Sequence, residues 1–129
     1  MNLRLFLIIV TVVSAIFGLG LLFIPGPFMA PFGLALDDGG QFMGRVAGES
    51  LIALGVIMWF SRDGQMSSVP LAALYGGATF NAIGLIVTLW AVLSNLVSSL
   101  GWVVVVLHVL LLAGFCYYAF EGRPKPAMR

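Results

Sequence analysis

Charged and polar side chains inside long apolar runs are the residues of this chain that could carry chemistry. Arg45 and Glu49 lie four residues apart in one such run, which makes them neighbours on one face of a helix. A charge within lipid is costly unless it meets a partner or water, so Glu49 is a candidate functional residue. It could form a salt bridge with Arg45, or it could serve as an ion, proton or ligand site.

Three further polar residues, Ser14, Asn81 and His108, occupy the other three apolar runs. At a rise of about 1.5 Å per residue, Ser14 and Asn81 fall near the centres of their runs, and Glu49 and His108 lie about 3–4 Å to one side. We therefore expect an intramembrane polar site of Arg45, Glu49, Asn81, His108 and Ser14. Its members could hydrogen-bond one another and fix the helix register, or they could relay protons or bind a small polar ligand.

His108 could also bind a cofactor, because an intramembrane histidine can ligate the metal of a haem or a chlorophyll. A haem held by two histidines would need a second chain. Val104, four residues earlier, is larger than the small residue that often accompanies pigment ligation. We therefore expect no cofactor, and we keep a pigment or haem at His108 as an alternative. The single Cys116 excludes an internal disulfide and a cysteine-based metal cluster.

The elements that must position these residues are membrane-spanning helices. The chain has 129 residues, of which 61% are hydrophobic and 9% charged, whereas about 25% of a soluble domain is charged. Runs over about 3–24, 41–60, 69–93 and 100–120 reach the roughly 20 residues needed to cross a bilayer. The sequence thus predicts an all-α integral membrane four-helix bundle in one domain. With a net charge of +1 and no basic run, the chain is no candidate for nucleic-acid binding.

The connections differ in length and polarity. Residues 25–40 are apolar in their first part, and Pro25, Pro27 and Pro31 argue against a regular helix there. We expect this loop to lie in the outer membrane interface or to fold against the helices. Asp38 and Gln41 fit an acidic capping box for the next helix. Polar loops follow over 61–68 and 94–99, and a polar tail over 121–129.

The cations predict the orientation, since positive residues gather on the cytoplasmic side. Only Arg45 falls on the side of the 25–40 loop. We therefore expect a multi-pass protein of the cell inner (plasma) membrane with both termini cytoplasmic. The other five cations share the opposite side: Arg4, Arg62, Arg123, Lys125 and Arg129.

Small residues recur at helical spacing and predict close helix packing. Small side chains let two helices approach closely in lipid, either within the bundle or in a homo-oligomer. The glycines concerned are Gly40, Gly44, Gly48 and Gly55 in the second run and Gly76 and Gly77 in the third.

The order of short motifs carries a resemblance. Pro25-Gly26-Pro27 is followed by Phe32-Gly33-Leu34, by Arg45-Val46-Ala47-Gly48 and by an apolar stretch ending at Arg62. This order resembles a broad group of small, uncharacterised four-span bacterial membrane proteins, which have no assigned activity. The resemblance is best over residues 1–62 and carries over no catalytic residue.

These observations favour a non-catalytic accessory or structural subunit of a larger membrane assembly, packing through small-residue helix faces. Its partners would be membrane lipids and other membrane protein subunits or further copies of itself. No nucleophile–base pair, phosphate loop or zinc spacing indicates an enzyme. Two alternatives remain open: a small transporter or channel using Glu49, and a quinone-, lipid- or pigment-binding protein using His108. A water-filled path to Glu49 would favour the first, and an apolar groove beside His108 the second.

Overall fold

The computed structural model describes residues 2–63 and 71–121, and it is all-α, as the sequence predicts. Four of its helices are long and apolar enough to cross a membrane, which is the pattern of a multi-pass membrane protein. The predicted start of the third run at residue 69, loop residues 64–68 and the tail 122–129 lie outside the described residues. The long helices are α1 (Leu3–Phe23), α3 (Asp38–Ser61), α4 (Leu71–Leu93) and α5 (Gly101–Glu121), and α2 (Pro25–Met29) and the 3₁₀ helix η1 (Ala30–Phe32) are short.

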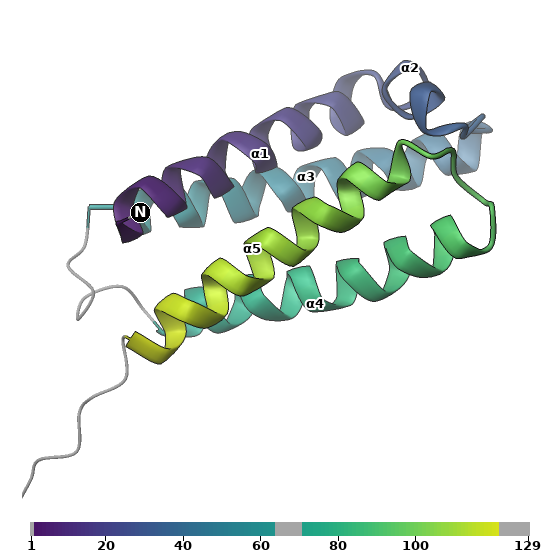
Figure 1. Cartoon of the computed structure of the whole chain (residues 1–129). Coiled ribbons are helices and arrows are strands. Elements are labelled where there is room, and N and C mark those ends of the chain that lie inside the picture. The colour runs from purple at the N-terminus through teal and green to yellow at the C-terminus, as the bar shows by residue number, and fades with distance from the viewer. Residues whose placement is uncertain (1, 64–70, 122–129) are drawn as a thin grey trace, which may run out of the picture.

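The long helices form two antiparallel pairs, α1 with α3 and α4 with α5 (Figure 1). The α1–α3 seam is built on Gly18 and Gly48, whose backbones face each other. A Cβ at Gly48 would lie 2.7 Å from the Gly18 carbonyl oxygen, and one at Gly18 would lie 3.1 Å from the Gly48 oxygen. Further along the seam, the Thr11 hydroxyl donates to the Gly55 carbonyl at 3.3 Å. Small residues thus allow backbone contact over several turns.

The α4–α5 pair uses its glycines differently. Gly77 and Gly84 of α4 receive the rings of Phe115 and His108 from α5, and each ring occupies the space that a Cβ would need. Gly76 meets no atom within 4 Å, so the close packing expected for it is not made within the described chain. The neighbouring residues Gly76 and Gly77 therefore differ, because Gly77 packs against a ring and Gly76 faces open space.

The connection from α1 to α3 is more regular than its prolines predict. Residues 25–32 form α2 and η1, whereas the sequence argued against a helix through Pro25 and Pro31. Pro25 stands in the first turn of α2, where backbone N–H groups have no helical acceptor, so proline costs no hydrogen bond there. Phe28 of α2 covers Gly20 and packs edge-on against Phe17 at 5.5 Å between ring centroids.

The start of α3 also corrects an expectation. Asp37, not Asp38, is the N-cap, and its side chain accepts a hydrogen bond from the Gly40 N–H at 2.7 Å. Gly40 and Gly44 consequently face this connection, and Gly44 also lies near Leu21 of α1. A Cβ on Gly40 would meet Asp37 and Leu36, and one on Gly44 would meet Pro25 at 3.1 Å.

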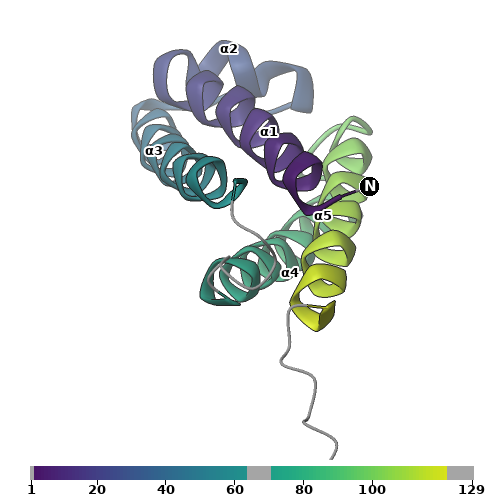
Figure 2. The ribbon, with the colours of Figure 1, turned by 90° about the vertical axis from the view of Figure 1, so that its left-hand side faces the viewer.

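The two pairs meet at both ends of the molecule. At the end that holds the N-terminus, side chains of all four long helices form the main core. At the other end, Ser98 donates from its backbone N–H to the Phe32 carbonyl at 2.7 Å and from its hydroxyl to the Pro31 carbonyl at 3.0 Å. Figure 2 looks along the helices and shows the α1–α3 pair on one side and the α4–α5 pair on the other. The largest fully buried side chains of the core are Phe6, Leu7, Met58, Leu74 and Phe115.

Candidate binding site between the helix pairs

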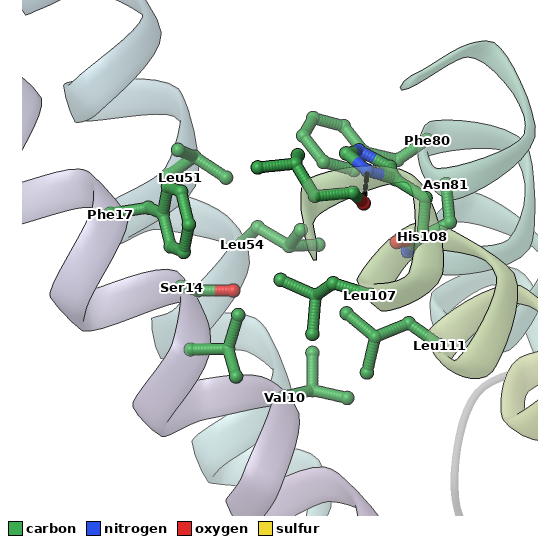
Figure 3. Close-up of a pocket in the computed structure, with 12 residues that line it drawn as sticks. Val10, Ser14, Phe17, Leu51, Leu54, Phe80, Asn81, Leu107, His108 and Leu111 are labelled. Atoms are coloured by element: carbon green, nitrogen blue, oxygen red, sulfur yellow. Dashed lines mark hydrogen bonds between the residues drawn. The ribbon is translucent and has the colours of Figure 1, made fainter. Parts of the chain in front are cut away.

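A cavity of about 130 Å³ lies between the two helix pairs, and all four long helices line it (Figure 3). A second hollow of about 440 Å³ shares Phe17 and Val104 with it and extends toward the connection between α1 and α3. Neither is lined by an Asp, Glu, Lys or Arg side chain among the described residues. The result is an apolar groove with a few polar groups at its inner end. Those polar groups are Ser14, Asn81 and His108.

Ser14 is placed by the α1–α3 seam, one turn before Gly18. The residue is 4% exposed, and its Cβ side faces Gly55 of α3. Its hydroxyl points into the cavity (Figure 3), and it makes no hydrogen bond to any residue that the structure describes. No side-chain nitrogen or oxygen that is fully buried in the described chain lacks a hydrogen-bond partner, so the unbonded Ser14 hydroxyl is accessible from the cavity and can bind an occupant there.

Asn81 presents an acceptor to the same cavity. Its Nδ2 donates to the Gly77 carbonyl at 2.8 Å, and a carbonyl can only accept, so the orientation of the amide is fixed. The residue is 3% exposed, and Oδ1 has no hydrogen-bond partner within residues 2–63 and 71–121. Asn81 can therefore accept a hydrogen bond from a cavity occupant.

His108 is held against α4. Its Nδ1 lies 2.8 Å from the Val104 carbonyl, which assigns the proton of a neutral ring to Nδ1. Its Nε2 edge lies against Gly84, whose own carbonyl accepts a hydrogen bond from Thr88 Oγ1 at 2.7 Å. A haem or pigment metal could reach Nε2 only if the ring left Gly84. In this arrangement the imidazole serves as a wall of the cavity.

The structure brings together three of the five residues expected in one polar site. Ser14, Asn81 and His108 line the cavity, but Glu49 and Arg45 are exposed on α3. The reason is helix rotation, because successive residues turn by about 100° and Gly48 already faces α1. The expected mutual hydrogen bonds are also absent, since Asn81 and His108 each bond a carbonyl of their own helix four residues earlier.

The expected salt bridge between Arg45 and Glu49 is not formed either. Among the described residues, the ion pairs are Arg4–Asp63 at 3.5 Å and Arg62–Asp63 at 3.2 Å. Holding two long exposed side chains in one geometry costs conformational entropy, which offsets much of the attraction. Within the described chain, Glu49 is therefore a carboxylate without an ion pair, at the twelfth of the 24 residues of α3.

A third hollow, of about 250 Å³, runs along the opposite side of the α1–α3 seam. Ile52 and Val56 of α3 line it, and they follow Glu49 by three and seven residues, on the same helical stripe. Ala15 and Leu19 line its α1 side. Glu49 thus stands at the edge of an apolar furrow on the outer surface of the pair.

The described part of the chain contains no group of three or more His, Cys, Asp or Glu residues that could hold a metal ion. Cys116 is a half-buried free thiol. Comparison with family models, with curated proteins and with solved structures finds no match to this chain.

Proposed function

We propose that this protein is a non-catalytic accessory subunit of a larger assembly in the plasma membrane, with both termini cytoplasmic. Its contact with the assembly is the α3 face around Glu49. The observation that carries the proposal is an exposed carboxylate, with no ion pair to any described residue, halfway along a helix that is apolar enough to span a membrane.

The position of Glu49 makes lipid an unsuitable neighbour. It lies eleven residues after the start of α3, or about 16 Å along the helix, with a similar length beyond it. An acidic side chain at the centre of a span costs about 2.5–3.5 kcal/mol on translocon-insertion scales. No group in the described chain offsets this cost by an ion pair. A basic or hydrogen-bond-donating side chain on another membrane helix would offset it.

The surface beside Glu49 suits such a helix. The furrow along the α1–α3 seam is apolar and holds the small residue Ala15, which admits a side chain from outside. A partner helix lying there would place its mid-membrane residue next to Glu49. We therefore infer that the partner is a membrane helix with a Lys, Arg or hydroxyl-bearing side chain near its centre.

Transport through Glu49 has less support. Ion or proton transport needs a polar path to the carboxylate, and Glu49 lines neither the cavity nor the hollow between the helix pairs. Those spaces are apolar and hold no charged lining residue among the described positions.

Photocrosslinking in the host membrane tests the proposal. A photoreactive amino acid at Ala53, exposed one turn from Glu49, should form an adduct with a second membrane protein. The matched control is Val103, which is 61% exposed on α5 and should not form that adduct. Glu49→Gln should weaken the adduct, because a neutral amide pairs less strongly with a cation. Equal adducts from both positions, or none from Ala53, would reject this face as the contact.

A further inference from the structure

We propose that the cavity between the helix pairs binds a neutral, membrane-soluble molecule with a hydroxyl-bearing ring at Ser14 and Asn81 and an apolar chain in the adjoining hollow. This site lies on the inner side of the α1–α3 pair, away from the exposed Glu49 face, so it does not depend on the partner proposed above.

The size of the cavity points to a ring. Its volume is about 130 Å³, and an engineered apolar cavity of about 150 Å³ is known to take up benzene. Two phenylalanine rings, those of Phe17 and Phe80, line it and provide flat apolar walls. A six-membered ring fits this space, whereas a second ring would have to extend into the hollow of about 440 Å³.

The polar atoms of the cavity indicate a hydroxyl on that ring. Ser14 Oγ can donate or accept, and Asn81 Oδ1 can only accept, so an occupant that offers both a donor and an acceptor satisfies the two residues together. A ring hydroxyl carries both a donor and an acceptor. A carbonyl would leave Asn81 Oδ1 without a donor, and an ether would do the same.

The absence of charged lining residues further restricts the chemical class of the occupant. No charged side chain lines the cavity or the adjoining hollow within the described chain. A buried charged headgroup without a counter-charge would bear a large desolvation cost, so phospholipids and fatty-acid anions do not fit. Phenols and quinols with an alkyl or isoprenoid chain do fit, because they are neutral and carry the required hydroxyl.

The alkyl or isoprenoid chain of such a molecule would lie in the adjoining hollow. It runs from Phe17 and Val104 toward Met29, Phe32 and Leu36, which are apolar residues around the first connection. Ordered water is the competing occupant of the inner cavity, since each water occupies about 30 Å³ and could bridge Ser14 and Asn81.

A partition experiment separates these occupants. The full-length protein is placed in phosphatidylcholine nanodiscs and mixed with empty nanodiscs of the same lipid. Either 4-octylphenol or octylbenzene is then added, and its distribution between the two populations is measured. The phenol should be enriched in the protein-containing discs at least threefold more than the hydrocarbon, because only the phenol bonds Ser14 and Asn81.

Two serine variants complete the test. Ser14→Ala keeps the Cβ that faces Gly55, so the seam is preserved, and it should lower phenol affinity about three- to tenfold without changing octylbenzene. Ser50→Ala is the matched control, since Ser50 donates to the Val46 carbonyl at 3.0 Å on an exposed face and should not affect either probe. No enrichment of the phenol would assign the cavity to water and overturn the proposal. Equal enrichment of both probes, or an unaffected Ser14→Ala variant, would overturn the hydroxyl recognition.

Discussion

Replacing Gly48 by alanine should destabilise the α1–α3 pair, because the added methyl group has only backbone to meet. It would lie 2.7 Å from both the Gly18 carbonyl oxygen and the Leu22 nitrogen of α1. Ordinary van der Waals contact begins at 3.4 Å, so the two helices must separate by roughly 0.7 Å. A flexible side chain could swing aside from such a contact, but a helix backbone cannot.

The expected magnitude follows from two opposing effects. Overpacking of this kind costs about 1–3 kcal/mol. Alanine recovers up to about 1 kcal/mol because it favours the helix over glycine. Separation of the helices would also lengthen the Thr11–Gly55 hydrogen bond, which is already 3.3 Å. We therefore expect Gly48→Ala to lower the unfolding free energy by about 1–2 kcal/mol, and Gly48→Leu to lower it further.

The matched control is Gly76→Ala, in a helix interior where an added Cβ meets nothing within 4 Å. This variant should be as stable as the parent or up to about 1 kcal/mol more stable. Loss of helix packing can be followed by circular dichroism and tryptophan fluorescence during titration of mild detergent micelles with sodium dodecyl sulfate. If Gly48→Ala and Gly76→Ala unfold at the same denaturant fraction, the backbone contact at the seam does not limit packing.

Three further predictions concern orientation, charge and the link between the pairs. In a background without the native cysteine, Asp38→Cys should react with an impermeant thiol reagent added outside the cell and Glu121→Cys should not; the reverse pattern would invert the proposed topology. Arg45→Met and Glu49→Gln should have additive effects on unfolding in detergent, with a coupling of less than about 0.5 kcal/mol, since no ion pair joins these residues. Larger coupling would indicate a pair that forms in solution. Ser98→Ala should lower stability by about 0.5–1.5 kcal/mol through loss of the hydroxyl bond to the first connection. Faster amide exchange in the 94–100 turn would accompany it, and an unchanged exchange rate would show that the backbone bond is sufficient.

The sequence predicts the helices well because apolar length and helix-breaking residues are local signals. The second span was expected from residue 41 and begins at Asp38, because Asp37 rather than Asp38 caps it. The short helix α2 was missed for a related reason. Its prolines predict a break, although a proline in the first turn of a helix has no hydrogen bond to lose.

The candidate site depends on which face of each helix a residue occupies, and depth in the membrane does not determine that face. The sequence places Ser14, Asn81 and His108 at similar depths in the membrane, and in the structure these three residues line one cavity. Glu49 has a similar depth by the same calculation, but the rotation of α3 places it on a face that does not line the cavity. Gly48, the preceding residue, indicates this placement of Glu49. Because Gly48 lies at the α1–α3 contact, the next residue must lie on another face of the helix.

Residue spacing within one helix cannot predict which side chains of another helix pack against its glycines. The placement of His108 against Gly84 joins residues 24 positions apart on different helices, and it depends on the relative shift of α4 and α5. That shift is set by many contacts at once, including Phe115 over Gly77. Sequence periodicity gives the faces of each helix but not the register between two helices.

The division into two helix pairs has a consequence for how the chain enters the membrane. The glycine seam of α1 and α3 is complete without α4 or α5, and the connection between them packs on the same pair. Helices that are stable across the bilayer can associate after insertion, and here the first two can do so while the second two are still being synthesised. A ribosome-bound chain stalled beyond α3 should therefore already protect a cysteine at Gly55 from modification, whereas a cysteine at Gly77 should become protected only after α5 has been inserted.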